Sequence, residues 1–243
     1  MTKHAETDNQ IITFSRFSFS GRPNKWEAFK KMGETFPPDQ IEGLQFLKKV
    51  GVGRDGGFSI WPDFGQYGWL AVWDSAKAAE SFFKENEVYL EWERLSSSNI
   101  RFYMVCKQYH GQWQGQQPFE CQSAPITGYH IATITRARVK PKYLFHFWRQ
   151  VPAIRKSLRQ NDKCDLAFGF GEWPIIELAT LSFWKNEDDL KGFAYSTRRH
   201  QKAIKDTRRL EWYSEEMFSR FYVYKAVGNA DMLPEDMKYL ASQ

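Results

Sequence analysis

The 243-residue sequence predicts an α+β fold built from two copies of one β-α-β-β-α-β unit. Three observations support this: an internal repeat, a fixed order of strand-like and helix-like periods in each copy, and a low-complexity stretch between the copies. Residues 58–86 align with residues 170–197 once one residue is removed from the first copy, and Trp73 then matches Trp184. A duplicated unit of this kind constrains the architecture more than any local propensity does.

The segments that flank this alignment repeat as well. TFSRF at 13–17 resembles TITRA at 133–137, and RFYMV at 101–105 resembles RFYVY at 220–224. Each half of the chain therefore contains the whole pattern.

The periods within each copy predict its strands and helices in order. Alternating, β-rich segments predict strands at 11–17, 44–52, 67–73, 129–137, 165–171 and 176–184, with a last strand closing each unit. Asn24 is expected to cap the first helix, and Pro141 to open its counterpart, which Pro152 should kink or end early. A polar cap at Asp74 or Asn186 begins the second helix of each unit.

The order β-α-β-β-α-β is that of the ferredoxin-like fold, an antiparallel sheet with both helices on one face. The open face of one sheet can be covered by the sheet of the other copy. We therefore expect a first ferredoxin-like repeat at 10–106, a linker rich in Gln, Gly and Pro at 107–127, a second repeat at 128–227, and a C-terminal tail at 228–243.

Composition narrows the classes of function. The net charge is +5 with 26% charged residues, so no strong nucleic-acid or anionic-membrane footprint is indicated. Aromatic residues reach 17%, enough for a heavy core or for a cavity that takes a flat apolar ligand. Three cysteines without a C-x-x-C spacing support neither a disulfide framework nor a zinc cluster, and they suit a reducing cytoplasm. No stretch approaches the roughly 18 apolar residues of a membrane span, so a soluble protein is expected.

The second half carries the most specific pattern, GFGEWPIIELATLSFW at 169–184 followed by HQKAIKDTRRLEWYSEEMFSRF at 200–221. With GLQFLKKVGVGRDGGFS and LAVWDSAKAAESF in the first half, the chain resembles the spheroidene monooxygenase family over residues 10–225. The resemblance implies a dimeric α/β-barrel type of fold, a b-type haem with its iron, and the O2-dependent introduction of a keto group into a carotenoid. An external electron donor such as a ferredoxin is then needed, because no flavin or nicotinamide fingerprint is present.

His200 is the candidate iron ligand. A helix over about 187–209 places it on the same apolar stripe as Phe193, facing the sheet. A lone helix histidine is more often a packed side chain, but the resemblance favours ligation of haem iron by its neutral imidazole. The first copy has Tyr89 at the matching position, which predicts a single haem site, in the second repeat.

Other residues are candidates for contact with the cofactor. Arg199 and Arg136 are candidate partners of the haem propionates, because a planar guanidinium matches a carboxylate. Trp173 is a candidate wall of the haem pocket, although its Trp-Pro pair more often marks a turn that enters a strand. Glu215 and Glu216 are neighbours on a strand, face opposite ways, and are expected to form a cap or an ion pair.

Other functions remain open at this level. They are a haem-binding carrier or sensor without catalysis, a cofactor-free oxygenase of the same fold, and a nucleic-acid module. The last is disfavoured because the RNA-binding aromatic motif is missing and the net charge is low. The identity of the apolar substrate, homo-oligomerisation and peripheral membrane contact stay undecided.

Overall fold

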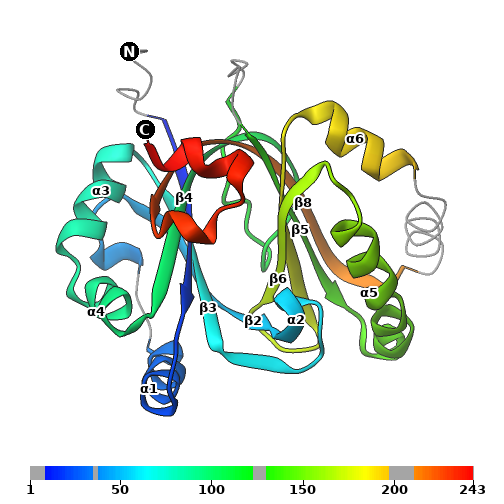
Figure 1. The fold of residues 1–243 in the computed structure, drawn as a ribbon, viewed down its shortest axis with the longest axis horizontal. Helices are drawn as coiled ribbons and strands as arrows, with labels where there is room; N and C mark the ends of the chain where they lie inside the picture. Colours follow the sequence, from blue (N-terminus) through cyan, green and yellow to red (C-terminus); the bar gives the residue numbers. More distant parts are fainter. Residues whose placement is uncertain (1–8, 35–37, 123–129, 197–210, 243) are drawn as a thin grey trace.

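The strands of this computed structural model form one closed antiparallel barrel. The structure describes residues 9–34, 38–122, 130–196 and 211–242. The strands are β1 (Ile11–Ser18), β2 (Leu44–Gly53), β3 (Pro62–Trp73), β4 (Ser98–Gly111), β5 (His130–Val139), β6 (Cys164–Gly171), β7 (Glu177–Trp184) and β8 (Tyr213–Gly228). They follow one another around the barrel in the order β1-β3-β2-β6-β7-β5-β8-β4, with the helices outside (Figure 1). The strands expected from alternation are all confirmed, and β3 begins earlier than expected, at Pro62.

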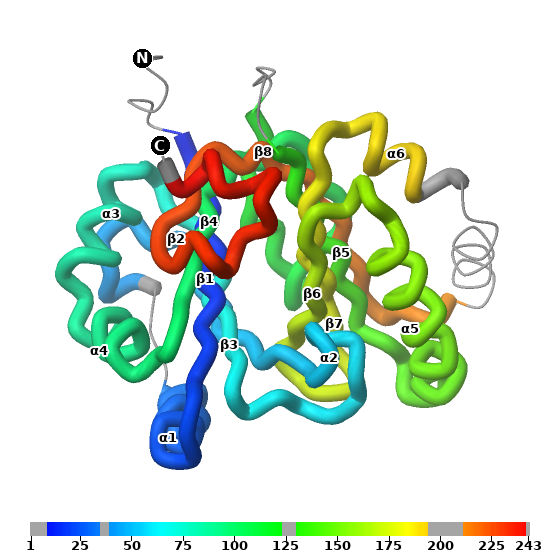
Figure 2. Tube along the Cα trace, viewed as in Figure 1, coloured from blue at the N-terminus to red at the C-terminus, as the bar shows by residue number. Residues whose placement is uncertain are grey.

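Each half of the barrel has the same internal pairing. The third strand of a half pairs with its first and second strands, and its fourth strand pairs with its first. Contacts between β4 and β8 and between β2 and β6 join the two halves and close the barrel. The chain colours in Figure 2 show the first half on one side of the view and the second half on the other.

The α-helices and short 3-10 helices lie around the barrel. They are α1 (Arg22–Met32), η1 (Pro38–Gln40), α2 (Arg54–Gly57), α3 (Ala76–Glu85), α4 (Glu87–Leu95), η2 (Pro141–Tyr143), α5 (Leu144–Arg159), α6 (Glu187–Ser196), η3 (Ala230–Met232) and η4 (Glu235–Ser242). The second helix of the first half is thus two helices, α3 and α4, with Asn86 capping the latter.

Three expectations about helix ends need correction. Asn24 does not cap α1, because its side-chain amide donates to the carbonyl of Leu95 across the fold and Gly21 precedes the helix. Ser75, not Asp74, caps α3 through its hydroxyl. Pro152 does not end its helix, because α5 continues to Arg159 with its buried face packed on the sheet. The cap at Asn186 is confirmed, since its side-chain oxygen accepts the amide of Asp189 at 2.9 Å.

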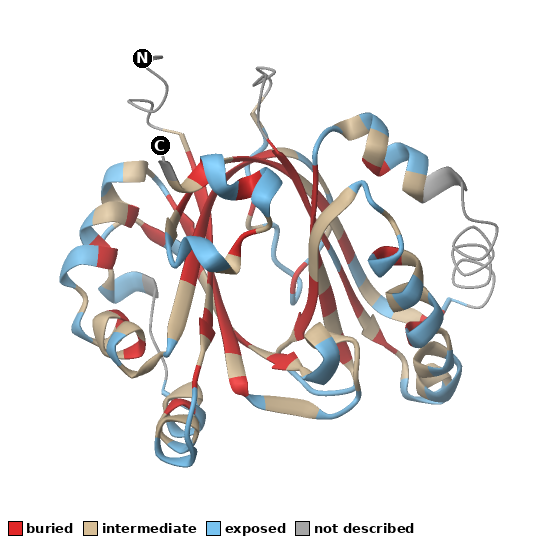
Figure 3. Ribbon diagram, in the orientation of Figure 1, coloured by how far each residue is buried: buried red, intermediate tan, exposed pale blue. Residues whose placement is uncertain are grey.

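The buried side chains form two layers, one inside the barrel and one between the sheet and the helices (Figure 3). The inner layer is rich in phenylalanine, and the ring centroids of Phe102 and Phe183 lie 4.5 Å apart. The outer layer of the first half is rich in tryptophan and tyrosine. Both layers follow from strand alternation, which sends successive side chains to opposite faces.

The segments expected as a linker and a tail belong partly to the core. Residues 107–111 continue β4, and Trp113 and Phe119 beyond them are buried in the barrel because their large rings pack inside it. In the C-terminal segment Leu233, Met237 and Leu240 also belong to the buried cluster inside the barrel. Within the described ranges, no helix has the length and apolar character needed to cross a membrane.

A hydrogen-bonded triad holds the C-terminal segment against the barrel. His130, at the start of β5, lies 2.7 Å from the Tyr239 hydroxyl through Nδ1 and 2.9 Å from an oxygen of Asp165 through Nε2. The imidazole is almost fully buried, so both its nitrogens find partners. This histidine therefore has a structural explanation.

Candidate functional site

The inside of the barrel is filled by side chains. Its core residues come from all eight strands and from the segments around Trp113 and Leu240, and nearly all are under 6% exposed. Protein interiors are packed about as densely as organic crystals, so a ligand of haem size has no room there without large rearrangement. The faces between the sheet and the helices are the remaining places for a large ligand.

In the first half, aromatic rings fill the space between sheet and helices. Trp92 of α4 packs against Trp69 of β3 at 5.3 Å and against Phe17 of β1 at 5.4 Å between ring centroids. Tyr89 of α4 is fully buried there, and its hydroxyl lies 2.9 Å from the hydroxyl of Ser15. Large rings thus occupy this face between the described helices and strands of the first half.

The second half has small residues at the matching positions. The alignment of TFSRF at 13–17 with TITRA at 133–137 equates Ser15 with Thr135, and strand register extends the comparison to their partners: Ser15 pairs with Trp69 on β3, and Thr135 pairs with Thr180 on β7. Two residues further along β1 and β5, the first half has Phe17 and the second half has an alanine, Ala137. A tryptophan and a phenylalanine are thus replaced by a threonine and an alanine.

The exposure of these residues agrees with their size. Ser15 and Trp69 are each 1% exposed in the middle of the first sheet. On the helix side of the second sheet Thr135 is exposed and Thr180 is half-buried, although both lie within strands that are paired on both sides. We call the region around Thr135, Thr180 and Ala137 the hollow.

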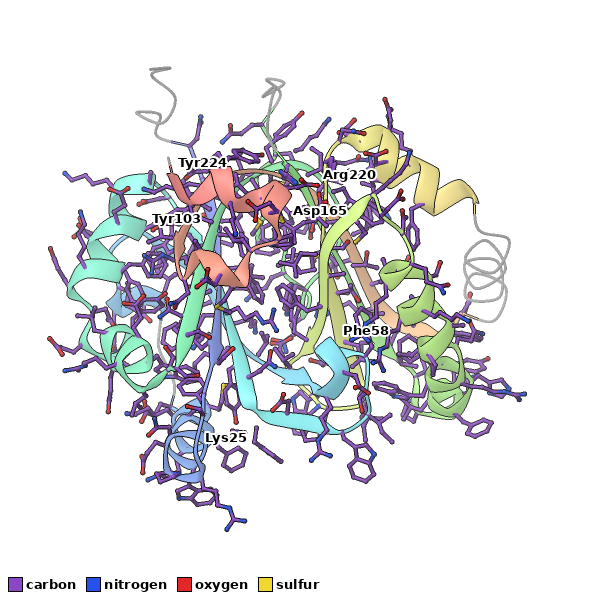
Figure 4. The ribbon with its side chains drawn as sticks, in the orientation of Figure 1. Lys25, Phe58, Tyr103, Asp165, Arg220 and Tyr224 are labelled. Carbon is purple, nitrogen blue, oxygen red and sulfur yellow. The ribbon has the colours of Figure 1, made fainter. Side chains whose placement is uncertain are left out.

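One cationic side chain near the hollow has an unused donor. Arg220 of β8 pairs with Thr133, the neighbour of Thr135 on the same face of β5. Its Nε is buried and has no hydrogen-bond partner among the residues that the structure describes. Buried donors in proteins are nearly always paired, so an unpaired guanidinium nitrogen is a candidate for binding an acidic ligand group. Figure 4 labels Arg220 on β8.

Sequence reasoning did not single out Arg220. The alignment of RFYMV with RFYVY equates it with Arg101, but strand register disagrees by two residues: Arg101 pairs with Ser15, whereas Arg220 pairs with Thr133. Arg101 is satisfied by Tyr89 and Tyr103. The sequence alone shows only that Arg220 lies on the helix-facing side of a strand. Its position near Thr133 becomes evident only from the pairing of β5 with β8.

Arg136 points into the barrel, away from the hollow. Its guanidinium forms an ion pair with Glu215 and lies 3.4 Å from carboxylate oxygens of both Glu172 and Glu177. It also lies 4.9 Å from the ring centroid of Trp113. Its charge is already compensated by three carboxylates, so a haem propionate would have to compete with them. We call these four charged residues the Arg136 cluster.

Glu215 holds the turn after β4 in place. Its two oxygens accept the backbone amides of Gln114 at 2.9 Å and Gly115 at 2.8 Å. As expected for neighbours on a strand, Glu215 is turned inward and Glu216 is exposed. Burial alone would raise the pKa of Glu215, but the two amides and the guanidinium of Arg136 outweigh it and lower the pKa.

This lowered pKa predicts a pH-dependent contribution to stability. The contribution is fully present above the pKa of Glu215 in the unfolded chain, and it is lost as the pH falls through the lower folded value. Glu215→Gln is therefore expected to lower the free energy of unfolding at pH 7 by about 1–3 kcal/mol, and by less in acid. Urea unfolding at neutral and acidic pH measures this, and a loss independent of pH would contradict it.

The remaining sequence candidates lie elsewhere. Trp173 is 66% exposed in the turn before β7, on the outer surface of the molecule. The turn role of the Trp-Pro pairs is confirmed, since β3 begins at Pro62 and β7 begins shortly after Pro174. His200 and Arg199 fall outside the described residues. In the described part of the chain, no group of three His, Cys, Asp or Glu side chains could hold a metal ion.

Three spheroidene monooxygenases are similar to the chain in sequence. No protein-family model matches the chain. A spheroidene monooxygenase of Rubrivivax gelatinosus is 30% identical over 200 residues, which cover 81% of this chain and 75% of that protein. The enzyme of Cereibacter sphaeroides with the same name is 27% identical, covering 90% and 68%. That of Rhodobacter capsulatus is 25% identical, covering 90% and 92%.

Comparison with solved structures shows the same fold in other proteins. An aldoxime dehydratase superposes with a TM-score of 0.59 at 11% identity, covering 92% of this chain and 87% of its own. An aldoxime dehydratase in complex with butyraldoxime gives a TM-score of 0.58 at 11% identity, covering 90% and 81%. At such low identity the likeness extends to the fold alone.

Proposed function

The chain belongs to the spheroidene monooxygenase family and is a monooxygenase, and from that premise we propose that it uses haem to convert an extended, carotenoid-like substrate to a ketone. We further propose that the haem lies on the helix side of the second half, over the hollow. The main support for this location is that the first half has Trp69 where the second half has the smaller Thr180.

The residues around the hollow fit a haem. A porphyrin is flat and apolar at its centre and carries two carboxylates at one edge. The small side chains of Thr135, Thr180 and Ala137 leave room against the sheet, and the buried, unpaired Nε of Arg220 offers a donor to a propionate. We therefore add Arg220 to the sequence candidates Arg199 and Arg136, and the prior pairing of Arg136 makes it the weakest of the three.

The pairing of the two halves also supports His200 as the ligand. Tyr89, its counterpart in the first half, faces the sheet, and its hydroxyl meets Ser15. Ser15 and Thr135 are equivalent in the alignment of TFSRF with TITRA, and on this ground we propose His200, the counterpart of Tyr89, as the iron ligand. Bound haem would supply the activation of O2. The protein's own groups orient the cofactor and keep water from the reacting carbon.

We also propose an electron donor and a cellular setting for the reaction. Electrons must come from an external donor such as a ferredoxin, and the cysteines suit a cytoplasmic setting.

We propose that the two halves are ferredoxin-like repeats that arose by tandem duplication, as in dimeric α/β barrels. Their shared strand order, with the first strand between the third and the fourth, supports this.

An absorption spectrum tests the function. Protein expressed with a haem precursor is expected to show a Soret band that His200→Ala shifts or removes, together with a fall in iron content. Incubation with O2, a reduced ferredoxin and a carotenoid extract should give a product that has gained oxygen. A coloured protein without turnover would indicate a carrier or sensor, and a colourless protein with turnover would indicate a cofactor-free oxygenase. A mutant with the wild-type Soret band would remove His200 from the proposal.

A further inference from the structure

Exposed aromatic side chains gather along one edge of the molecule. The six aromatic residues are Trp26, Phe29, Trp61, Phe64, Phe145 and Trp173, which we call the aromatic rim, and each is at least 45% exposed. They belong to α1, the start of β3, the start of α5 and the turn before β7, all along the lower edge of Figure 1. Of the large apolar side chains exposed in the described residues, all but Tyr239 lie on these segments or next to them in sequence.

The segments of the rim are neighbours. Phe29 packs on Trp26 at 5.7 Å and meets Phe64 at 5.5 Å, which joins α1 to β3. The indole of Trp148 in α5 donates to the carbonyl of Ile175 at 3.1 Å, which joins α5 to the turn that carries Trp173. The exposed rings thus form two groups, one on α1 and β3 and one on α5 and the turn before β7, and exposed apolar surface of this kind commonly marks an interaction site.

The first helix turns large apolar side chains outward at this edge. Only Ala28 of α1 is fully buried. Trp26 is 60% exposed. The helix thus presents its largest apolar rings to the outside.

Basic charge is concentrated on the two helices of the rim. In α1 the basic residues are Arg22, Lys25, Lys30 and Lys31, against one carboxylate. In α5 they are Arg149, Arg155, Lys156 and Arg159, with no Asp or Glu. These two helices carry more net positive charge than the whole chain, whose total is only +5. Carboxylates compensate part of this charge, since Lys30, Lys31 and Arg155 form ion pairs with Glu27, Glu91 and Asp55. The other basic residues of the two helices include Lys25, which lies at this edge in Figure 4.

We propose that the aromatic rim and the basic side chains of α1 and α5 dock the protein on the surface of an anionic lipid bilayer. Tryptophan and other aromatic rings favour the boundary between headgroups and acyl chains, and Lys and Arg are attracted by anionic lipids. A second copy of this chain fits less well, because a symmetric interface would place like charges opposite each other. The proposal is independent of the cofactor and of the reaction.

Vesicle co-sedimentation of the full chain tests the proposal. The protein is expected to sediment with phosphatidylcholine vesicles that contain phosphatidylglycerol, and to be released by salt. Arg22→Gln combined with Arg149→Gln should weaken binding about fivefold for each charge removed. Lys84→Gln, an exposed residue of α3 away from the rim, makes the same charge change and should leave binding unchanged.

The aromatic part has its own variant. Trp26→Ser combined with Phe145→Ser should weaken vesicle binding at least tenfold without changing the circular dichroism spectrum, because both side chains are exposed. Absence of binding to anionic vesicles, or wild-type binding by these variants, would overturn the proposal. Light scattering that shows self-association lost in the same variants, without vesicle binding, would assign the rim to a second copy instead. Neither outcome bears on haem binding.

Discussion

Thr180→Trp is expected to weaken haem binding by on the order of a hundredfold while leaving the barrel folded. The equivalent position in the first half already holds a tryptophan, Trp69, which packs against Tyr89 at 5.5 Å and is 1% exposed. A tryptophan side chain at Thr180 therefore has a conformation that the strand geometry accepts. It would occupy the space that the proposal gives to the porphyrin.

Titration with haem measures this effect. Forcing a bulky group into a fitted site costs about 1–3 kcal/mol or more, so haem affinity should fall by on the order of a hundredfold. Thr180→Val keeps the volume of the side chain and is the matched control, with affinity close to that of the wild type. If the tryptophan variant binds haem as well as the control does, the cofactor does not lie over the hollow, whatever its ligand.

Arg136→Met is expected to destabilise the protein strongly. The side chain of Arg136 is 2% exposed and compensates the charges of Glu172, Glu177 and Glu215. Removing one partner of a buried ion pair leaves the other charges uncompensated, which costs about 3–5 kcal/mol. The turn held by Glu215 should loosen as well, because the position of that carboxylate depends on the guanidinium.

Arg138→Met is the matched control for this prediction. Arg138 lies two residues further along β5 and pairs with Glu177, but its side chain is 43% exposed. Exposed ion pairs contribute about 0–1 kcal/mol, so its loss should be small. Denaturant unfolding of both variants gives the comparison, and equal losses would show that the Arg136 cluster does not stabilise the fold. Arg136→Lys should recover only part of the loss, because an ammonium lacks the planar set of donors with which the guanidinium reaches three carboxylates.

Some departures from the sequence predictions have a common physical cause. The predictions for Asn24 and Pro152 used local rules for helix caps and helix breakers. In the structure a long-range hydrogen bond to Leu95 takes the Asn24 side chain, and the packing of α5 continues through Pro152. Local propensity is a weak preference that tertiary contacts can override.

The sequence by itself determined the order of the strands and helices and the family. Alternation places Phe14 and Leu70 on one face of their strands and Trp69 on the other, because side-chain direction in a strand has a period of two. The same rule correctly predicted that the side chains of Glu215 and Glu216 face opposite ways. These properties depend on neighbours along the chain, so they can be read from it.

Only the tertiary structure determined which residues from distant segments contact one another. The carboxylates around Arg136 come from three separate segments, and the contrast between Trp69 and Thr180 has meaning only when strand register makes them equivalent. The unpaired nitrogen of Arg220 and the clustering of the aromatic rim likewise depend on which strands and helices meet. Hydrogen bonding, burial and charge compensation act through space, and the distances involved are set by closure of the barrel.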